Sequence, residues 1–177
     1  MANQTKWAID PGHSEIQFKV KHLAISNVTG TFKAFQGEIK SENEDFSGAA
    51  VRVTIDVNSI DTNNTQRDQH LKGAEFFDAQ QYPTIKFEGI IEKAAADYTL
   101  VGDATIHGIT RPLTLDVDFT GTGKGRFGDK RAGFELSGKL NRKDFGLTWN
   151  MPTEAGGLIV GEEIKLHFDI QVIGQDR

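Results

Sequence analysis

Residues 164–172 read Ile-Lys-Leu-His-Phe-Asp-Ile-Gln-Val, with apolar and polar side chains in alternation. A strand places successive side chains on opposite faces, whereas a helix returns to one face after three or four residues. The alternation therefore predicts an antiparallel strand with one buried face and one face in water. The same period of two occurs in segments 16–20, 51–58, 113–119 and 134–140.

Other segments complete an all-β pattern. Segment 31–39 changes phase between its apolar residues, which suggests a β-bulge. Segments 84–93 and 98–107 flank a short link and are typical of a hairpin. With a short strand near Trp7, the pattern predicts eight or nine strands, and the glycine-rich stretch 121–128 is predicted to be a turn.

The composition restricts the function. The chain has 177 residues and no cysteine, which favours a single domain over residues 1–177 and excludes disulfides and thiolate chemistry. Its 20 Lys and Arg residues against 25 Asp and Glu residues give a net charge of -5. Because phosphate binding needs a basic face, no nucleic-acid partner is expected.

The sequence also bears on location. No apolar run approaches the roughly 20 residues that span a bilayer, so no integral membrane segment is expected. The first residues, MANQTKWAID, lack the apolar core of a signal peptide. The sequence as it stands therefore predicts a cytoplasmic protein. A periplasmic or secreted location is the alternative if a signal peptide has been removed.

A long insertion around residues 61–83, where the alternation stops, is expected to hold the one short helix. Asn63 is the expected N-cap, with Gln66 in the reciprocal position, and the helix is expected to reach about Leu71. The aromatic residues that follow are expected to form an apolar lid or plug: Phe76, Phe77 and Tyr82. A loop of this length inside a sheet protein is often functional.

Two charged clusters are candidates for a site, and each has two interpretations. In the segment 67–70, Asp68 and His70 would suit acid–base catalysis, whereas an ion pair of Arg67 with Asp68 would brace the loop. The segment 142–144, Arg-Lys-Asp, is either a structural ion pair or part of an anion-binding rim. The five histidines show no metal-ligand spacing, so no metal site is predicted.

Strands with a single apolar face form either a sandwich or a barrel, and a barrel of about eight strands has room for side chains or one small ligand. Glycines interrupt the inward-facing positions at Gly89, Gly102 and Gly138. Either they let the strands coil, or they leave a cavity lined by Phe, Leu, Ile and Val. The second hypothesis predicts that Gly102→Leu or Gly138→Leu keeps the fold and weakens the binding of an elongated apolar ligand.

A series of different short motifs occurs along nearly the whole chain. They are Trp7-Ala8-Ile9-Asp10, His13-Ser14-Glu15-Ile16, Val28-Thr29-Gly30-Thr31-Phe32, Ser59-Ile60-Asp61-Thr62, Arg67-Asp68-Gln69-His70-Leu71, Phe76-Phe77-Asp78, Tyr82-Pro83-Thr84-Ile85-Lys86-Phe87, His107-Gly108-Ile109-Thr110-Arg111-Pro112 and Asn141-Arg142-Lys143-Asp144-Phe145-Gly146. In this order and spacing, they resemble the motifs of the YceI-like polyisoprenoid-binding family.

The resemblance implies a lipocalin-like, eight-stranded antiparallel barrel with an elongated apolar pocket. It implies a small-molecule lipid as the ligand, such as an isoprenoid quinone, a polyprenyl lipid or a fatty amide, without a further cofactor and without established catalysis. It also implies that a homodimer is one expected assembly. Many family members are exported to the periplasm, whereas this sequence shows no leader.

The patterns and the resemblance together predict that the chain binds, and sequesters or carries, an elongated amphiphile. The expected ligand-binding residues are Phe18, Val20, His22, Phe32, Val53, Ile55, Arg67, His70, Phe76, Phe87, Leu100, Phe134, Leu136 and Arg142. The apolar residues would contact the tail, and Arg67 and Arg142 would lie near the head group. Two alternatives stay open: an enzyme acting on an isoprenoid lipid through Asp68 and His70, and a protein-interaction module with a filled barrel.

Overall fold

A computed structural model of the chain describes residues 4–23, 25–150 and 160–175, which fold into eleven strands, one α-helix and three short 3-10 helices. In chain order these are β1 (Thr5–Ile9), η1 (Pro11–His13), β2 (Glu15–His22), β3 (Ser26–Phe32), β4 (Phe35–Ser41), β5 (Ala50–Asp56), η2 (Val57–Ser59), β6 (Ile60–Asp61), α1 (Thr65–Lys72), β7 (Thr84–Ala94), β8 (Asp97–Ile106), β9 (Ile109–Lys124), β10 (Lys130–Asn141), η3 (Arg142–Phe145) and β11 (Val160–Gln175).

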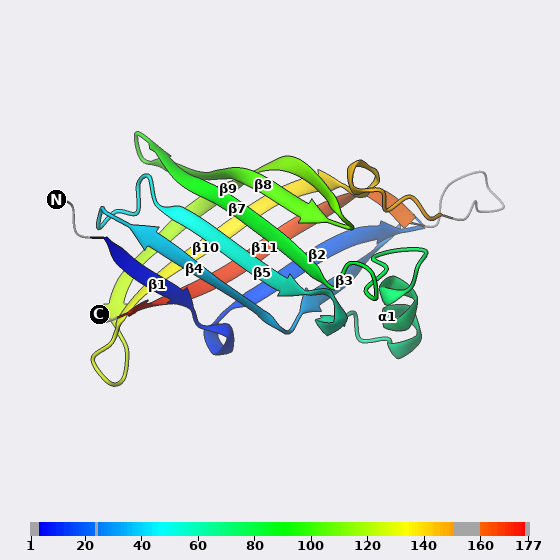
Figure 1. The fold of residues 1–177 in the computed structure, drawn as a ribbon, viewed down its shortest axis with the longest axis horizontal. Helices are drawn as coiled ribbons and strands as arrows, with labels where there is room; N and C mark the ends of the chain where they lie inside the picture. Colours follow the sequence, from blue (N-terminus) through cyan, green and yellow to red (C-terminus); the bar gives the residue numbers. More distant parts are fainter. Residues whose placement is uncertain (1–3, 24, 151–159, 176–177) are drawn as a thin grey trace.

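Eight of the strands form a closed ring in the order β1-β4-β5-β7-β8-β9-β10-β11, which β1 closes by pairing with β11. All the pairings are antiparallel, and β2, β3 and β6 extend the sheet from β11. The strands run obliquely along an elongated barrel, with α1 at one end and both termini at the other (Figure 1). The predicted all-β, eight-stranded antiparallel barrel with one short helix is confirmed.

One edge of the long strand β11 pairs with two strands, one after the other. Its residues 172–175 pair with β1, and Val160 and residues 164–169 pair with β2, with an irregularity between them. The chain between those partners turns through η1 and is bound to β11 at Gln171, whose carbonyl accepts from the Asp10 amide at 2.8 Å. The Gln171 amide in turn donates to the Ser14 hydroxyl at 2.9 Å. These bonds hold β1 and β2 on one continuous edge of β11.

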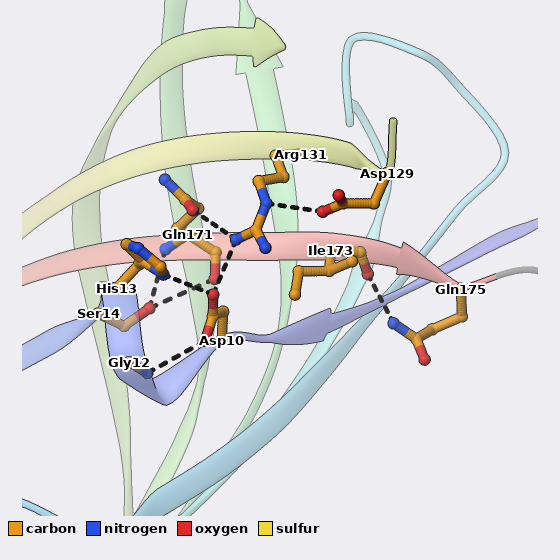
Figure 2. A network of polar contacts seen from close by, with 9 residues as sticks. All are labelled: Asp10, Gly12, His13, Ser14, Asp129, Arg131, Gln171, Ile173 and Gln175. Atoms are coloured by element: carbon orange, nitrogen blue, oxygen red, sulfur yellow. Dashed lines mark hydrogen bonds and ion pairs between the residues drawn. The ribbon is translucent and has the colours of Figure 1, made fainter. Parts of the chain in front are cut away.

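A polar network stabilises the same junction (Figure 2). Arg131 of β10 donates to Asp10 and to the side-chain oxygen of Gln171, each at 2.7 Å, and also binds Asp129. The hydrogen bond from Arg131, and next that from His13, holds the pKa of the Asp10 carboxyl below its usual value. The carboxylate of Asp10 therefore links η1 to β10, and Gln171 links both to β11.

Two local predictions are wrong. The phase change in 31–39 is not a bulge but a break, because β3 ends at Phe32 and β4 begins at Phe35. The chain changes partners there, from β2 and β6 to β1 and β5. The stretch 121–128 is only partly a turn, because β9 continues to Lys124 and carries an irregularity near Gly121, where φ is +126°.

Aromatic side chains fill the end of the barrel that holds the termini. Phe46, in the loop between β4 and β5, is 1% exposed. Its ring centroid lies 5.2 Å from that of Trp7, 5.3 Å from that of Phe119 and 5.0 Å from that of Phe134. Phe119 and Phe134 also stack on each other at 5.1 Å. We call Trp7, Phe46, Phe119 and Phe134 the aromatic plug, since they close this end.

The glycines proposed to open a cavity do not do so. A β-carbon at Gly102 would overlap the carbonyl oxygen of Glu88 on the neighbouring strand, and one at Gly89 would lie 2.7 Å from the carbonyl oxygen of Val101. A β-carbon at Gly138 would lie 2.5 Å from a methyl group of Leu115. These glycines allow close approach of neighbouring strands and side chains. The prediction that leucine is tolerated at Gly102 is therefore wrong, because a larger side chain there meets backbone rather than empty space. At Gly138 the near neighbour is the end of the Leu115 side chain, so the prediction for Gly138→Leu stays a prediction.

We expect Gly102→Ala to destabilise the fold by about 1–3 kcal/mol, because the new methyl group overlaps backbone that cannot move aside without breaking the β7–β8 ladder. Gly123→Ala is the matched control, since a β-carbon there meets nothing within 4 Å. It should leave the free energy of unfolding within about 0.5 kcal/mol of the parent value. Chemical denaturation measures both, and equal effects of the two variants would contradict the close-approach explanation.

Candidate functional site

The barrel encloses a cavity of about 400 Å³ between the aromatic plug and the end that carries α1. Sites for small organic ligands have volumes of roughly 300–1,000 Å³. Its wall is made almost entirely of inward-facing apolar side chains, which alternate with outward-facing polar ones along each strand. The apolar residues on the wall are Ile9, Ile16, Phe18, Val20, Val28, Phe32, Ile39, Val51, Val53, Ile55, Leu71, Phe76, Phe77, Ile85, Phe87, Ile91, Leu100, Ala104, Ile106, Leu113, Leu115, Val117, Phe134, Leu136, Leu140, Leu147, Val160, Ile164, Leu166, Phe168 and Ile170.

The two ends of the cavity differ. At the inner end the wall includes Phe134, whose ring also belongs to the aromatic plug. At the outer end the wall includes polar and charged residues from several elements, and Trp149. They are Lys21 and His22 of β2, Thr62 before α1, Arg67 and His70 of α1, and Arg142 of η3. Contacts tie three of these elements together at the rim, because His70 packs on Trp149 at 4.7 Å and Arg142 binds the carbonyl of Trp149. The cavity is therefore apolar at the plug and polar at the rim.

Arg142 holds the rim together rather than presenting a free guanidinium. It is 3% exposed, and it donates to the carbonyls of Leu147 and Trp149 at 2.7 and 2.8 Å. It also donates to the carbonyls of Gly161 and Val160 at 2.8 and 3.2 Å. Burial lowers the pKa of Arg142 from its usual value. Its predicted role as an ion pair or anion-binding group is thus replaced by a clamp that ties segment 147–149 to the start of β11.

The start of α1 is fixed through Thr62. Arg67 donates to the hydroxyl of Thr62 at 2.8 Å and to its carbonyl at 2.6 Å. Asp68 accepts from the amide of Thr62 at 2.9 Å and also from its hydroxyl. No ion pair joins Arg67 to Asp68 in the described part of the chain, so both side chains brace the loop through Thr62 instead.

The proposed acid–base pair is not assembled. Asp68 is engaged by Thr62, whereas His70 contacts a carboxylate oxygen of Glu75 at 2.7 Å. The ring of His70 also packs edge-on against Phe76 and Trp149. The two side chains therefore have separate partners, and His70 is the one on the cavity wall.

Two details of the insertion differ from prediction. The N-cap of α1 is Asn64, whose side chain accepts from the Arg67 amide at 3.0 Å, while Asn63 has a left-handed backbone with φ of +62°. Phe76 and Phe77 lie on the cavity wall as part of the expected lid, but Tyr82 packs against His107 at 4.9 Å. Sequence reasoning placed the helix correctly and its cap one residue early.

All fourteen residues expected to bind a ligand lie on the wall of this one cavity. The strand residues among them face the interior because they occupy alternate positions along their strands. Arg67, His70 and Phe76 come from the insertion. Sequence reasoning missed Trp149, which follows η3 in a segment without periodicity, and Thr62, which no motif singled out as a ligand contact.

The described residues include no group of three or more His, Asp or Glu side chains that could hold a metal ion. Within those residues, no helix has both the length and the apolar character needed to cross a bilayer.

Comparisons with known proteins give a consistent picture. The family model described as a YceI-like domain matches residues 7–172. A UPF0312 protein of Staphylococcus epidermidis is 38% identical over 162 residues, which cover 91% of this chain and 93% of the relative.

Solved structures share the architecture. BcnA of Burkholderia cenocepacia superposes with a TM-score of 0.79 at 23% identity, over 92% of this chain and 98% of that protein. A polyisoprenoid binding domain from Saccharophagus degradans superposes with a TM-score of 0.70 at 14% identity, over 96% of this chain and 98% of that domain. At these identities the likeness shows a common fold.

We expect Arg142→Ala to destabilise the protein by at least about 3 kcal/mol, because it leaves several buried carbonyls without a donor. Arg52→Ala is the matched control, since that exposed guanidinium forms an ion pair with exposed Glu88, and it should cost less than about 1 kcal/mol. Chemical denaturation of both variants provides the comparison. Equal midpoints for the two would show that the clamp contributes nothing to stability.

Proposed function

The chain belongs to the YceI-like family, as its motifs predicted, and from that membership and its cavity we propose that it binds an elongated amphiphile and sequesters or carries it. The observation that carries the proposal is an apolar chamber of about 400 Å³ that is closed at one end by the aromatic plug and polar at the other. A ligand with one long apolar tail and one polar end matches that division.

The chamber favours a hydrocarbon tail for a simple energetic reason. Each CH2 group moved from water to an apolar environment contributes about 0.8 kcal/mol. A polar group pushed to the inner end would lie among Phe134, Leu136 and Val117, which offer it no hydrogen bond. The tail therefore enters first, and the polar end stays at the rim.

The ligand class that fits best is a polyisoprenoid, an isoprenoid quinone or a similar lipid. One protein of the same fold is described as a polyisoprenoid binding domain, which supports this class. Branched isoprenoid tails also suit a wall built from Phe, Leu, Ile and Val side chains. We propose this class for the present chain on fold, family and wall chemistry together.

Arg67 is the proposed contact for the polar end of the ligand. Its Nε and Nη2 atoms are bonded to Thr62, which fixes the guanidinium on the rim. Among the described residues Nη1 makes no hydrogen bond, so it is available to an oxygen of a head group. His22 lies on the same wall and is a second candidate contact.

The two alternative functions fit the geometry less well. An enzyme using Asp68 and His70 would need those groups to act together, and they bind Thr62 and Glu75 instead. A protein-interaction module with a filled barrel would have no chamber, whereas this barrel is filled only at its plug. We therefore propose a binding protein without a catalytic step.

The direct test is to purify the protein gently, extract it with organic solvent and identify bound lipids by mass spectrometry. A stoichiometric amphiphile is expected. Titration with a long-chain quinone then compares Ala104→Leu, which fills part of the chamber, with Ala50→Leu on the exposed face of β5. The first variant should weaken binding about tenfold or more, because leucine adds three carbons inside the space for the tail, and the second should leave it unchanged.

Thermal unfolding of both variants checks that Ala104→Leu remains folded. A clean extract combined with no binding of quinones, polyprenols or fatty amides would overturn the proposed function. Equal affinities for the two variants would place the ligand outside the chamber.

A further inference from the structure

The outer face of β10, β11 and β2 is divided by charge. Three exposed lysines lie side by side across the strands, because Lys139 is paired with Lys165 and Lys165 with Lys19. We call Lys19, Lys139 and Lys165 the lysine row. Like charges directly opposite each other on neighbouring strands are destabilising, so this arrangement carries a cost within the barrel itself.

An acidic row crosses the same face farther from the rim. Glu135 is paired with Asp169 and with Asp118, and Asp169 is paired with Glu15. Along each strand the acidic row and the lysine row are four positions apart, a distance of roughly 13 Å at the rise of a strand. Since that distance exceeds the screening length of about 8–10 Å at physiological salt, the two rows present distinct fields.

The lysine row lies on the rim side of this division. Along β2 the order is Glu15, then Lys19, then Lys21 and His22, and His22 is on the cavity wall at the rim. Lys139 has Glu163 at 4.0 Å. Lys19, Lys21 and Lys165 form no ion pair with any described residue. On the rim side of the face, Glu163 and Glu162 pair with Lys139 and Lys143, while these three lysines lie on the same strands without such a partner.

Exposed apolar side chains lie beyond these lysines. The turn between β2 and β3 presents Leu23, which is 42% exposed, and Ile25, which is 83% exposed. This hairpin ends at the same end of the barrel as α1 (Figure 1). An exposed apolar side chain beside lysines can enter the interface of a bilayer, where it meets apolar surroundings and anionic head groups.

We propose that the rim docks on an anionic phospholipid bilayer through the lysine row, Lys21 and the apolar tip of the β2–β3 turn. Docking in this orientation brings the cavity opening to the membrane and turns the acidic row away from it. The choice of a bilayer as partner rests in part on the proposed function, because a long-chain amphiphile is supplied and received within bilayers. The lysine row beside the cavity opening is the reason to expect an anionic rather than a neutral bilayer.

The opposite end of the barrel has similar surface features and therefore serves as a control for the docking proposal. There the turn between β9 and β10 exposes Phe127, and Lys124 is paired with Lys130. This end also has an exposed aromatic residue and a cross-strand lysine pair, but the aromatic plug separates it from the chamber. The proposal therefore assigns membrane docking to one end of a molecule that carries lysines at both.

The test measures sedimentation of the full chain with vesicles of phosphatidylcholine alone and with vesicles containing about one-third phosphatidylglycerol. Binding is expected only to the anionic vesicles and should fall as salt rises from about 0.1 to 1 M. The double variant K19Q/K165Q should weaken binding about tenfold or more, since each lysine near an anionic surface contributes about fivefold. Ile25→Ser should weaken it separately.

The matched control is K124Q/K130Q, which makes the same change of net charge at the plugged end and should bind vesicles like the parent. Equal losses for the two double variants, or equal binding to both kinds of vesicle, would overturn the proposal, and no vesicle binding by the folded parent would overturn it as well. Each variant is also titrated with a short-chain soluble quinone, read out by calorimetry. Quinone binding without vesicle binding would refute docking alone, and the reverse result would refute the proposed function alone.

Discussion

Backbone hydrogen bonding along β11 is the interaction on which the barrel depends. This strand has 16 residues and pairs with β10 along most of its length, while its other edge is shared between β1 and β2. A shorter strand would reach only one of those partners, and the ring would stay open at one end. The turn at η1 and the network around Asp10, Arg131 and Gln171 exist where this edge changes partners.

The closed ring creates an interior that is used in two ways. Near the termini, Phe46 from a loop inserts between Trp7, Phe119 and Phe134 and fills the barrel. Toward α1, the inward-facing side chains of the strands line a chamber of about 400 Å³. Packing at one end thus gives the chamber a floor, and the Arg142 clamp with the bracing of Thr62 gives it an ordered rim.

Much of this could be read from the sequence, because a period of two reports both the strand and its buried face. That single property placed Phe18, Phe87 and Leu136 on one wall. The sequence does not report what lies opposite a residue across the sheet, so the carbonyl of Glu88 facing Gly102 and the carbonyls that bind Arg142 were not foreseen. A phase change likewise looks the same whether a strand bulges or, as after Phe32, changes partners.

The central claim is that a tail extends into the chamber until it meets the aromatic plug. Calorimetric titration with amphiphiles that share one head group and differ in chain length tests this most directly. Affinity should rise about fourfold for each added CH2 group, which corresponds to about 0.8 kcal/mol, and then level off once the chain reaches the plug. An affinity that does not change with chain length would contradict the account.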